Sequence, residues 1–166
     1  MKFVVDSQEL NRCISTARSV IKTGTVAVAS LKNITFDVSE DSVVLLASNG
    51  TASIKLPMSC KRDLIDTECG KFSVEASAIG KIADKLPKGD VNLEVSGNLL
   101  KLKAKGVKVN VGLVEDDVSE AIPVEPVVSA VVKADDMREC VGNVSYAVAK
   151  PSESRVALQG SAIRFG

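Results

Sequence analysis

The sequence predicts an α+β fold built from duplicated β-α-β-β-β repeats, with helices on one face of antiparallel sheets. Three observations predict it: an amphipathic helix pattern occurs three times, a three-strand pattern occurs twice, and an acidic segment with two prolines separates the second repeat from the third. The first two repeats are expected to share one hydrophobic core, because a single unit of this size buries little apolar surface alone.

Each of the three repeats begins with a short β pattern and continues into a helix with apolar residues at i, i+3, i+4 and i+7. The β patterns are Phe3 and Val5, Phe72 and Val74, and Ala130 and Val132. The apolar helix positions are Leu10, Cys13, Ile14 and Ala17, then Ile79, Ile82, Ala83 and Leu86, then Met137, Cys140, Val141 and Val144. Candidate N-cap residues near the three helix starts are Ser7, Ser77 and Asp135. Three copies in register indicate duplication.

The strands that follow each helix also repeat. The segment FDVSEDSVVLLASNGTASIKL, residues 36–56, resembles LEVSGNLLKLKAKGVKVNVGL, residues 93–113, with one residue fewer before the second turn. Alternating apolar residues separated by polar and glycine turns predict a meander of three antiparallel strands. The polar stretch 57–71 is expected to join the two repeats.

Both complete repeats fall in a first domain that is expected to span residues 1–122, with a connector from about residue 114. Residues 123–166 then begin a second domain that has room for a strand, a helix and one meander strand, within RVALQGSAIRFG. A lone helix with two strands buries its apolar face poorly. We therefore expect the chain to be a fragment, a truncated form or a chain completed by another chain.

The overall charge restricts how the chain could bind nucleic acid. With 21 basic and 21 acidic residues, it cannot act through bulk basicity, although cations gathered on one face remain possible. Four Phe, one Tyr and no Trp make base stacking an unfavourable mode. No apolar run of membrane length and no secretory signal pattern occur, so we expect a cytoplasmic protein without membrane contact.

Catalytic and metal-binding patterns are scarce. The absence of His excludes Ser-His-Asp and Cys-His catalysis and zinc sites that use His. Neither a P-loop nor a strand-linked GxGxxG is present, so no cofactor is expected. The EDD at 115–117 could imitate a carboxylate metal site, but its place in the connector favours a solvated linker. Four cysteines without CxxC spacing indicate reduced thiols, and a Cys60–Cys69 disulfide would need an oxidising compartment.

Several segments, taken in order, resemble one family. MKFVV opening into a helix, LKNITFDV with LLASNGTASIKL, KLPKGDVNLEVSGNLLKLKAKG and SRVALQG resemble the DNA polymerase III beta subunit, the bacterial DNA sliding clamp. The chain departs from it at GTVAVAS, where family members commonly carry a Pro-rich stretch, and at Asn49, where many have Asp. The resemblance implies the DNA-clamp (processivity) fold. Six similar domains from two chains would form a ring, with sheets outside and twelve helices around duplex DNA.

The resemblance also implies a role without catalysis, in which the clamp tethers the polymerase to its template. A sliding clamp contacts phosphates without reading bases, so it needs basic residues on its helices. The candidate DNA-facing residues are Arg12, Arg18, Lys22, Lys81, Lys85, Lys88, Arg138 and Lys150. With the nearby acids counted, the first two helices and their exits each carry +2 and the third carries −1. The alternative for each of these cations is an ordinary solvated helix face.

Two further sites follow from the resemblance alone. The contact between chains of a homodimer ring would use Ile82, Leu86, Val109 and Val111, although helical periodicity also places Ile82 and Leu86 in their own core. A pocket that captures short linear motifs of polymerase and clamp-loader subunits would use Arg155 and Leu158. Its other walls would come from later domains, and Leu158 could instead be a core residue of an alternating strand.

Two other functions remain open from the residues. The first is a duplicated α+β interaction module that assembles through its sheets and never binds DNA. The second is a small enzyme that uses carboxylates alone. Strongly salt-dependent DNA binding would distinguish a clamp from the interaction module.

Overall fold

The computed structural model describes residues 1–21, 29–61, 69–114, 130–148 and 160–164. It divides into two compact parts, the N-terminal part (Met1–Pro123) and the C-terminal part (Val124–Gly166). The expected domain boundary at residue 122 falls in segment 115–129, outside the described residues.

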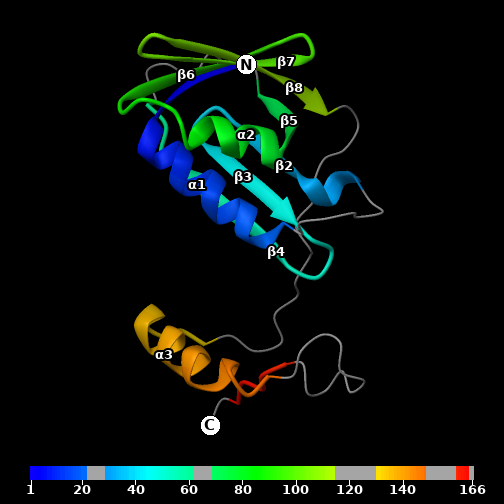
Figure 1. The fold of residues 1–166 in the computed structure, drawn as a ribbon, viewed down its shortest axis with the longest axis vertical. Helices are drawn as coiled ribbons and strands as arrows, with labels where there is room; N and C mark the ends of the chain where they lie inside the picture. The colour runs from blue at the N-terminus through cyan, green and yellow to red at the C-terminus, as the bar shows by residue number, and fades with distance from the viewer. Residues whose placement is uncertain (22–28, 62–68, 115–129, 149–159, 165–166) are drawn as a thin grey trace. The chain divides into compact units, whose positions relative to one another are not determined.

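The first two repeats both have the order β-α-β-β-β (Figure 1). The first consists of β1 (Lys2–Asp6), α1 (Ser7–Val20), the short 3-10 turn η1 (Ala29–Lys32), β2 (Asn33–Val38), β3 (Val43–Ser48) and β4 (Ser53–Met58). The second consists of β5 (Gly70–Glu75), α2 (Ala76–Ala83), β6 (Asp90–Ser96), β7 (Leu99–Ala104) and β8 (Val107–Val114). The predicted α+β duplication is confirmed.

The strands form one antiparallel sheet in the order β1-β6-β7-β8-β5-β2-β3-β4, in which the two repeats exchange their opening strands. In the pairing of β1 with β6, Phe3 lies opposite Leu93. In the equivalent pairing of β5 with β2, Phe72 lies opposite Phe36. Neither repeat therefore completes a sheet from its own strands, and the two repeats fold around one core.

The edges of this sheet meet just after β4. Val5 and Cys60 form an isolated antiparallel bridge, and the Lys61 N–H donates to the Val4 carbonyl at 2.9 Å. The counterpart in the second repeat is the pairing of Val74 with Leu113. The sheet thus curls so that its two edges come together at this point.

The strand register corrects the alignment of the two meanders. Ala47 lies opposite Ile54, seven positions on, whereas Ala104 lies opposite Val107, three positions on. The second hairpin of the later repeat is therefore four residues shorter. As a result, Val107 of β8 is the structural equivalent of Ile54 of β4. The end-to-end match of 36–56 with 93–113 misses this shift.

Both helices of the N-terminal part lie side by side over the sheet (Figure 1). The buried face of α1 contains the four predicted apolar residues, Leu10, Cys13, Ile14 and Ala17. On α2, Ile79 and Ala83 are buried and Ile82 is half-buried. This helix ends at Ala83, one turn earlier than its apolar pattern suggests, since Pro87 disfavours helical backbone at the residue before it. Leu86 consequently lies in the exit turn.

The helix caps differ from those predicted. The N-cap residues are Asp6, Glu75 and Lys133, one or two positions before Ser7, Ser77 and Asp135. The Gln8 N–H donates to Asp6 Oδ1 at 2.8 Å, whereas Glu75 and Lys133 make no side-chain cap. For α1 and α2 the reason is that the preceding strand runs directly into the helix, so the last strand residue becomes the cap.

Three aromatic rings lie at the centre of the core. The rings of Phe36 and Phe72 stack with centroids 4.9 Å apart and planes 4° apart, and Phe3 lies 6.5 Å from Phe36. Phe3 and Phe36 come from the first repeat and Phe72 from the second, so burial of these rings stabilises the shared core rather than either repeat alone.

In the C-terminal part, α3 (Ala134–Ser145) forms as predicted, but the strand expected at Ala130–Val132 does not. Residues 160–164 are also not a strand, and the rest of the expected meander strand lies outside the described residues. In the N-terminal part, the opening strand of each repeat pairs with a meander strand of the other repeat. The described residues of the C-terminal part contain no meander strand with which an opening strand could pair. Accordingly, the apolar face of α3 stays uncovered, with Val141 47% and Val144 46% exposed.

Candidate nucleic-acid interface

The surface of α1, α2 and the exit of α2 carries an excess of positive charge. Residues 7–20 and 76–88 hold five basic side chains and two carboxylates, a balance of +3. The five cations are Arg12, Arg18, Lys81, Lys85 and Lys88. Since the two helices lie side by side, these cations share one face of the N-terminal part, here called the helical face. The sixth predicted cation, Lys22, lies outside the described residues.

Arg12 is closely paired within α1. Its Nε donates to Glu9 Oε2 at 2.7 Å and its Nη2 donates to Glu9 Oε1 at 2.9 Å. Glu9 also accepts from the Ser59 N–H at 3.3 Å. The hydrogen bond from Arg12 is the main cause that lowers the pKa of Glu9 to about 2, so the carboxylate stays charged at neutral pH. Arg12 therefore adds little net charge to the helical face.

Arg18 reaches from α1 to α2. Its Nη1 lies 3.5 Å from Asp84 Oδ2, and its side chain passes so close to Gly80 that a Cβ there would lie 2.5 Å from Nη1. The two side chains of the ion pair are 39% and 54% exposed. A long, solvated pair of this kind is weak, so Arg18 keeps most of its capacity to bind an anion.

The three lysines of α2 and its exit are exposed. The exit is held by the start of α1: the Ser7 N–H donates to the Gly89 carbonyl at 2.9 Å, and the Gly89 N–H donates to Ser7 Oγ at 3.1 Å. Gly89 has φ 122°, a conformation that favours glycine. Lys88 is thereby fixed close to the beginning of α1, although the sequence pattern gave no sign of this contact.

The predicted cations of the third helix are only partly described. Arg138 is 78% exposed and pairs with Asp135 through Nη1 and Oδ1 at 2.7 Å, while Lys150 lies outside the described residues. Asp135, Asp136 and Glu139 leave α3 itself acidic. The third helix thus lacks the positive balance of α1 and α2.

The four residues proposed for contact between chains are unequally covered. Val111 is buried with 6% exposure, Ile82 and Leu86 are half-buried against the core, and Val109 is half-buried. Three of the four keep some surface to offer a partner. The contact itself stays a prediction.

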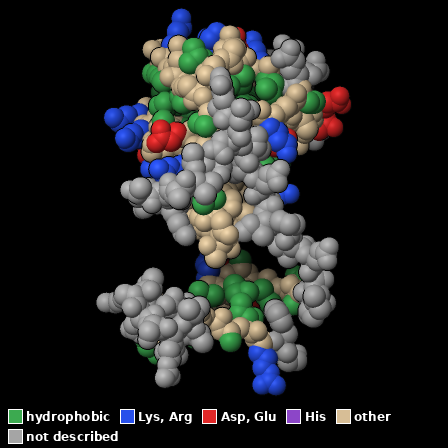
Figure 2. Space-filling model, turned by 90° about the vertical axis from the view of Figure 1, so that its right-hand side faces the viewer, with side chains coloured by type: hydrophobic (Ala, Val, Ile, Leu, Met, Phe, Trp, Pro, Cys, Tyr) green, Lys and Arg blue, Asp and Glu red, His purple; other side chains and the backbone are tan. Residues whose placement is uncertain are grey.

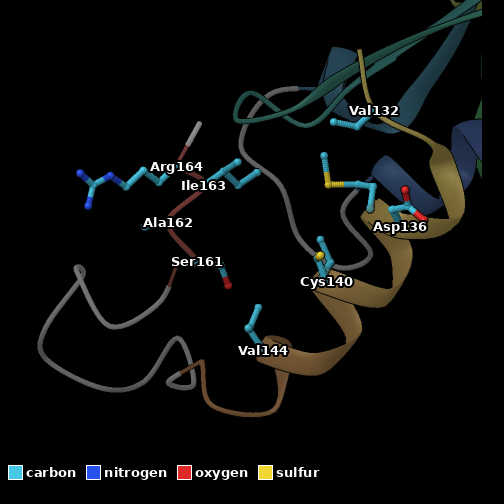
Figure 3. Close-up of a pocket in the computed structure, with 10 residues that line it drawn as sticks. Val132, Asp136, Cys140, Val144, Ser161, Ala162, Ile163 and Arg164 are labelled. Carbon is cyan, nitrogen blue, oxygen red and sulfur yellow. The ribbon is translucent and has the colours of Figure 1, made fainter. Parts of the chain in front are cut away.

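Of the predicted peptide pocket, Arg155 and Leu158 both lie outside the described residues. A cavity of about 390 Å³ does lie beside the apolar face of α3 (Figure 3). Ile163 points toward the helix from the opposite side and Arg164 points away. The residues that line this cavity are Val132, Asp136, Met137, Cys140, Val141, Val144, Ser161, Ala162, Ile163 and Arg164.

A second basic surface lies on the sheet, on the side away from the helices, and sequence reasoning missed it. Five lysines and three acids share this lysine face, a balance of +2; they are Lys2, Lys101, Lys103, Lys105, Lys108, Asp6, Asp90 and Glu94. Lys103 Nζ lies 3.1 Å from Glu94 Oε2, and this hydrogen bond lowers the pKa of Glu94. Figure 2 shows basic side chains at the end of the N-terminal part where β6, β7 and β8 lie. The alternation in KLKAKGVK, residues 101–108, is the signal that could have revealed it.

Nothing among the described residues supports catalysis. They contain no cluster of three potential metal ligands, and the EDD at 115–117 lies outside them. The four cysteines are free thiols. Burial raises the pKa of both Cys13 and Cys60 to about 11, so these thiols stay protonated and unreactive at neutral pH. No helix in the described part is long and apolar enough to cross a membrane.

Comparison with known structures identifies the fold. A DNA polymerase III beta subunit from Thermotoga maritima has a TM-score of 0.78 at 20% identity, covering 90% of this chain and 40% of its own. The beta subunit from Streptococcus pyogenes gives 0.77 at 19%, with 90% and 40% covered, and the Helicobacter pylori beta clamp gives 0.81 at 17%, with 93% and 41% covered. The chain therefore spans about 40% of the length of these relatives and shares their fold.

Sequence comparison identifies the family. No curated protein matches the chain. The sequence profile of the DNA polymerase III beta subunit, N-terminal domain, matches residues 1–118, which hold both complete repeats and the helical face. The chain thus belongs to the DNA polymerase III beta subunit family.

Proposed function

We propose that this chain serves in a DNA sliding clamp, a non-catalytic processivity factor of replication in the cytoplasm. In the ring form, a homodimer would encircle duplex DNA and tether the polymerase. Polymerase and clamp-loader subunits would bind through short linear motifs. DNA would be contacted through its phosphates, independently of sequence, because the described residues offer cations rather than stacking aromatics.

One observation carries this proposal. In a chain of zero net charge, α1 and α2 lie side by side on one face, and together with the exit of α2 they carry +3. Arg12 is neutralised by Glu9, so Arg18, Lys81, Lys85 and Lys88 remain as the groups that would meet phosphate oxygens. Local concentration of charge attracts a polyanion even when the whole protein is neutral.

The test is the salt dependence of duplex DNA binding by the 166-residue chain, measured by fluorescence anisotropy. Each phosphate contact contributes about −0.9 to the slope of log Kobs against log salt. Replacing Lys81, Lys85 and Lys88 with Gln should weaken binding and flatten this slope. The matched control replaces Lys101, Lys103 and Lys108 on the lysine face, which removes the same charge from exposed or half-buried positions.

The lysine face favours a second candidate function, an interaction module that binds an anionic partner through its sheet. Its five lysines equal in number the five cations of the helical face. If the lysine-face variant loses DNA binding and the helical-face variant keeps it, DNA binds at the sheet and the clamp proposal is wrong. Equal losses would also contradict it, because a clamp contact requires the helical face to dominate.

A further inference from the structure

Gly80 is the buried glycine that α1 approaches most closely. A Cβ at this position would lie 2.5, 2.6 and 2.7 Å from Nη1, Cζ and Cδ of Arg18, so the Arg18 side chain would have to move to make room for it. Glycine is among the poorest helix formers, so its presence inside α2 needs a reason. The reason that the structure supplies is space, because the missing side chain leaves a notch through which Arg18 crosses from α1 to α2.

Beyond this notch, the Arg18 guanidinium pairs with Asp84, which lies one helical turn after Gly80. Its Nη1 lies 3.5 Å from Asp84 Oδ2, and this is its one ion pair with a described residue. A guanidinium has five N–H donors, so a single long contact leaves it able to donate elsewhere. Lys81 and Lys85 flank Asp84 on the same short segment, which keeps the surroundings of Arg18 positive.

We propose that Gly80 is a positioning residue for Arg18, and that Asp84 is a counterion which a DNA phosphate displaces. This inference rests on the proposed function, since it needs DNA at the helical face. The notch fixes where the guanidinium lies, between the two helices. Asp84 holds it there without DNA, and a phosphate accepts its N–H groups when DNA binds, because Arg matches phosphate geometry closely.

The first test concerns the notch and uses no DNA. In the full chain, Gly80→Ala should raise Tm less than it does in an Arg18→Ala background, because the new methyl group has to displace the Arg18 side chain. In the Arg18→Ala background the same substitution should raise Tm by about 2–4 °C, since no Arg18 side chain has to move and Ala favours the helix. Ser77→Ala, at an exposed position on the same helix, is the control and should behave alike in both backgrounds. An equal change in Tm for Gly80→Ala in both backgrounds would contradict the notch.

The second test concerns the phosphate contact and uses a labelled duplex at several salt concentrations. Arg18→Gln and Gly80→Ala should each reduce the salt slope by about 0.9, although the second leaves the net charge unchanged. The double variant should match either single variant, because both remove the same contact. Additive losses would show that Gly80 acts on DNA binding by another route.

Asp84→Asn tests the counterion. It should tighten DNA binding more than Asp41→Asn, which makes the same charge change at an exposed turn between β2 and β3. The extra gain should vanish in the Arg18→Gln background. An equal gain for both Asp variants would refute Asp84 as the counterion of Arg18. If the unaltered chain shows no salt-dependent DNA binding, the proposed function is wrong. The Tm comparison would still test whether Gly80 makes room for Arg18, because it uses no DNA.

Discussion

Helices α1 and α3 carry the same apolar spacing, and yet one is covered and the other is not. Leu10, Cys13 and Ile14 of α1 are buried against the sheet, whereas Cys140 and Val141 of α3 are exposed. The difference lies in the strands. Beneath α1 lie β1 to β4, part of a sheet to which both repeats contribute, and the described residues around α3 contain no strand. Periodicity thus predicts which face of a helix is apolar, and the sheet decides whether that face is buried.

The largest expected loss of stability comes from removing a buried side chain between a helix and the sheet of the N-terminal part. Ile79→Ala removes a side chain of 0% exposure from α2 and should cost about 2–5 kcal/mol of unfolding free energy. Val141→Ala on α3 should change it by less than about 0.5 kcal/mol, because that side chain is already 47% exposed. Urea denaturation followed by circular dichroism measures both. Similar losses would mean that α3 is covered after all.

A smaller effect is expected at the helix starts. Asp6→Ala removes the acceptor of the Gln8 N–H and should cost about 1 kcal/mol. Lys133→Ala, at the equivalent position before α3, removes no cap bond and should leave α3 unchanged. Thermal unfolding of the two variants compares them directly. A loss at Lys133 as large as that at Asp6 would contradict the assignment of the caps.

The smallest effect concerns pH. The pKa of Glu9 is lowered to about 2 in the folded chain, so its ion pair stabilises the fold above the usual carboxyl pKa and loses this contribution as the pH falls from about 4.5 toward 2. Glu9→Gln should remove this part of the acid sensitivity, seen as a smaller shift of the urea midpoint between pH 7 and pH 3. Asp135→Asn, which breaks a pair of the same i, i+3 spacing on α3, is the control. The solvated Asp135 pair should contribute nothing measurable.

Local features of the fold could be predicted from the sequence. The β-α-β-β-β order and the buried face of α1 follow from alternation and helical spacing, which depend on neighbouring residues. The exchange of opening strands could not be predicted in this way, because it pairs Phe3 with Leu93 across most of the domain. The same holds for the ends of the elements, where the strand residue Asp6, rather than Ser7, caps α1.

The candidate interface was predicted in part. The cations of α1 and α2 could be chosen from their helical positions, but the neutralisation of Arg12 by Glu9 and the passage of Arg18 over Gly80 depend on side-chain geometry. The lysine face could have been found, since Lys101, Lys103 and Lys105 alternate along one strand and its turn. Helical periodicity does not reveal it, because these lysines alternate with the period of a strand.

The exchange of opening strands also sets the order in which the chain can fold as it leaves the ribosome. The three strands of the first meander, β2 to β4, pair with one another, and these pairings can form before any later residue is synthesised. By contrast, β1 is synthesised first but has to wait for its partner β6, where Lys2 lies opposite Glu94. Contacts so distant in sequence slow folding, because a long loop must close before they form. The amino-terminal strand is therefore expected to stay without its main partner until β6 has been synthesised, and a nascent chain released before that point would leave the β6-facing edge of β1 unpaired.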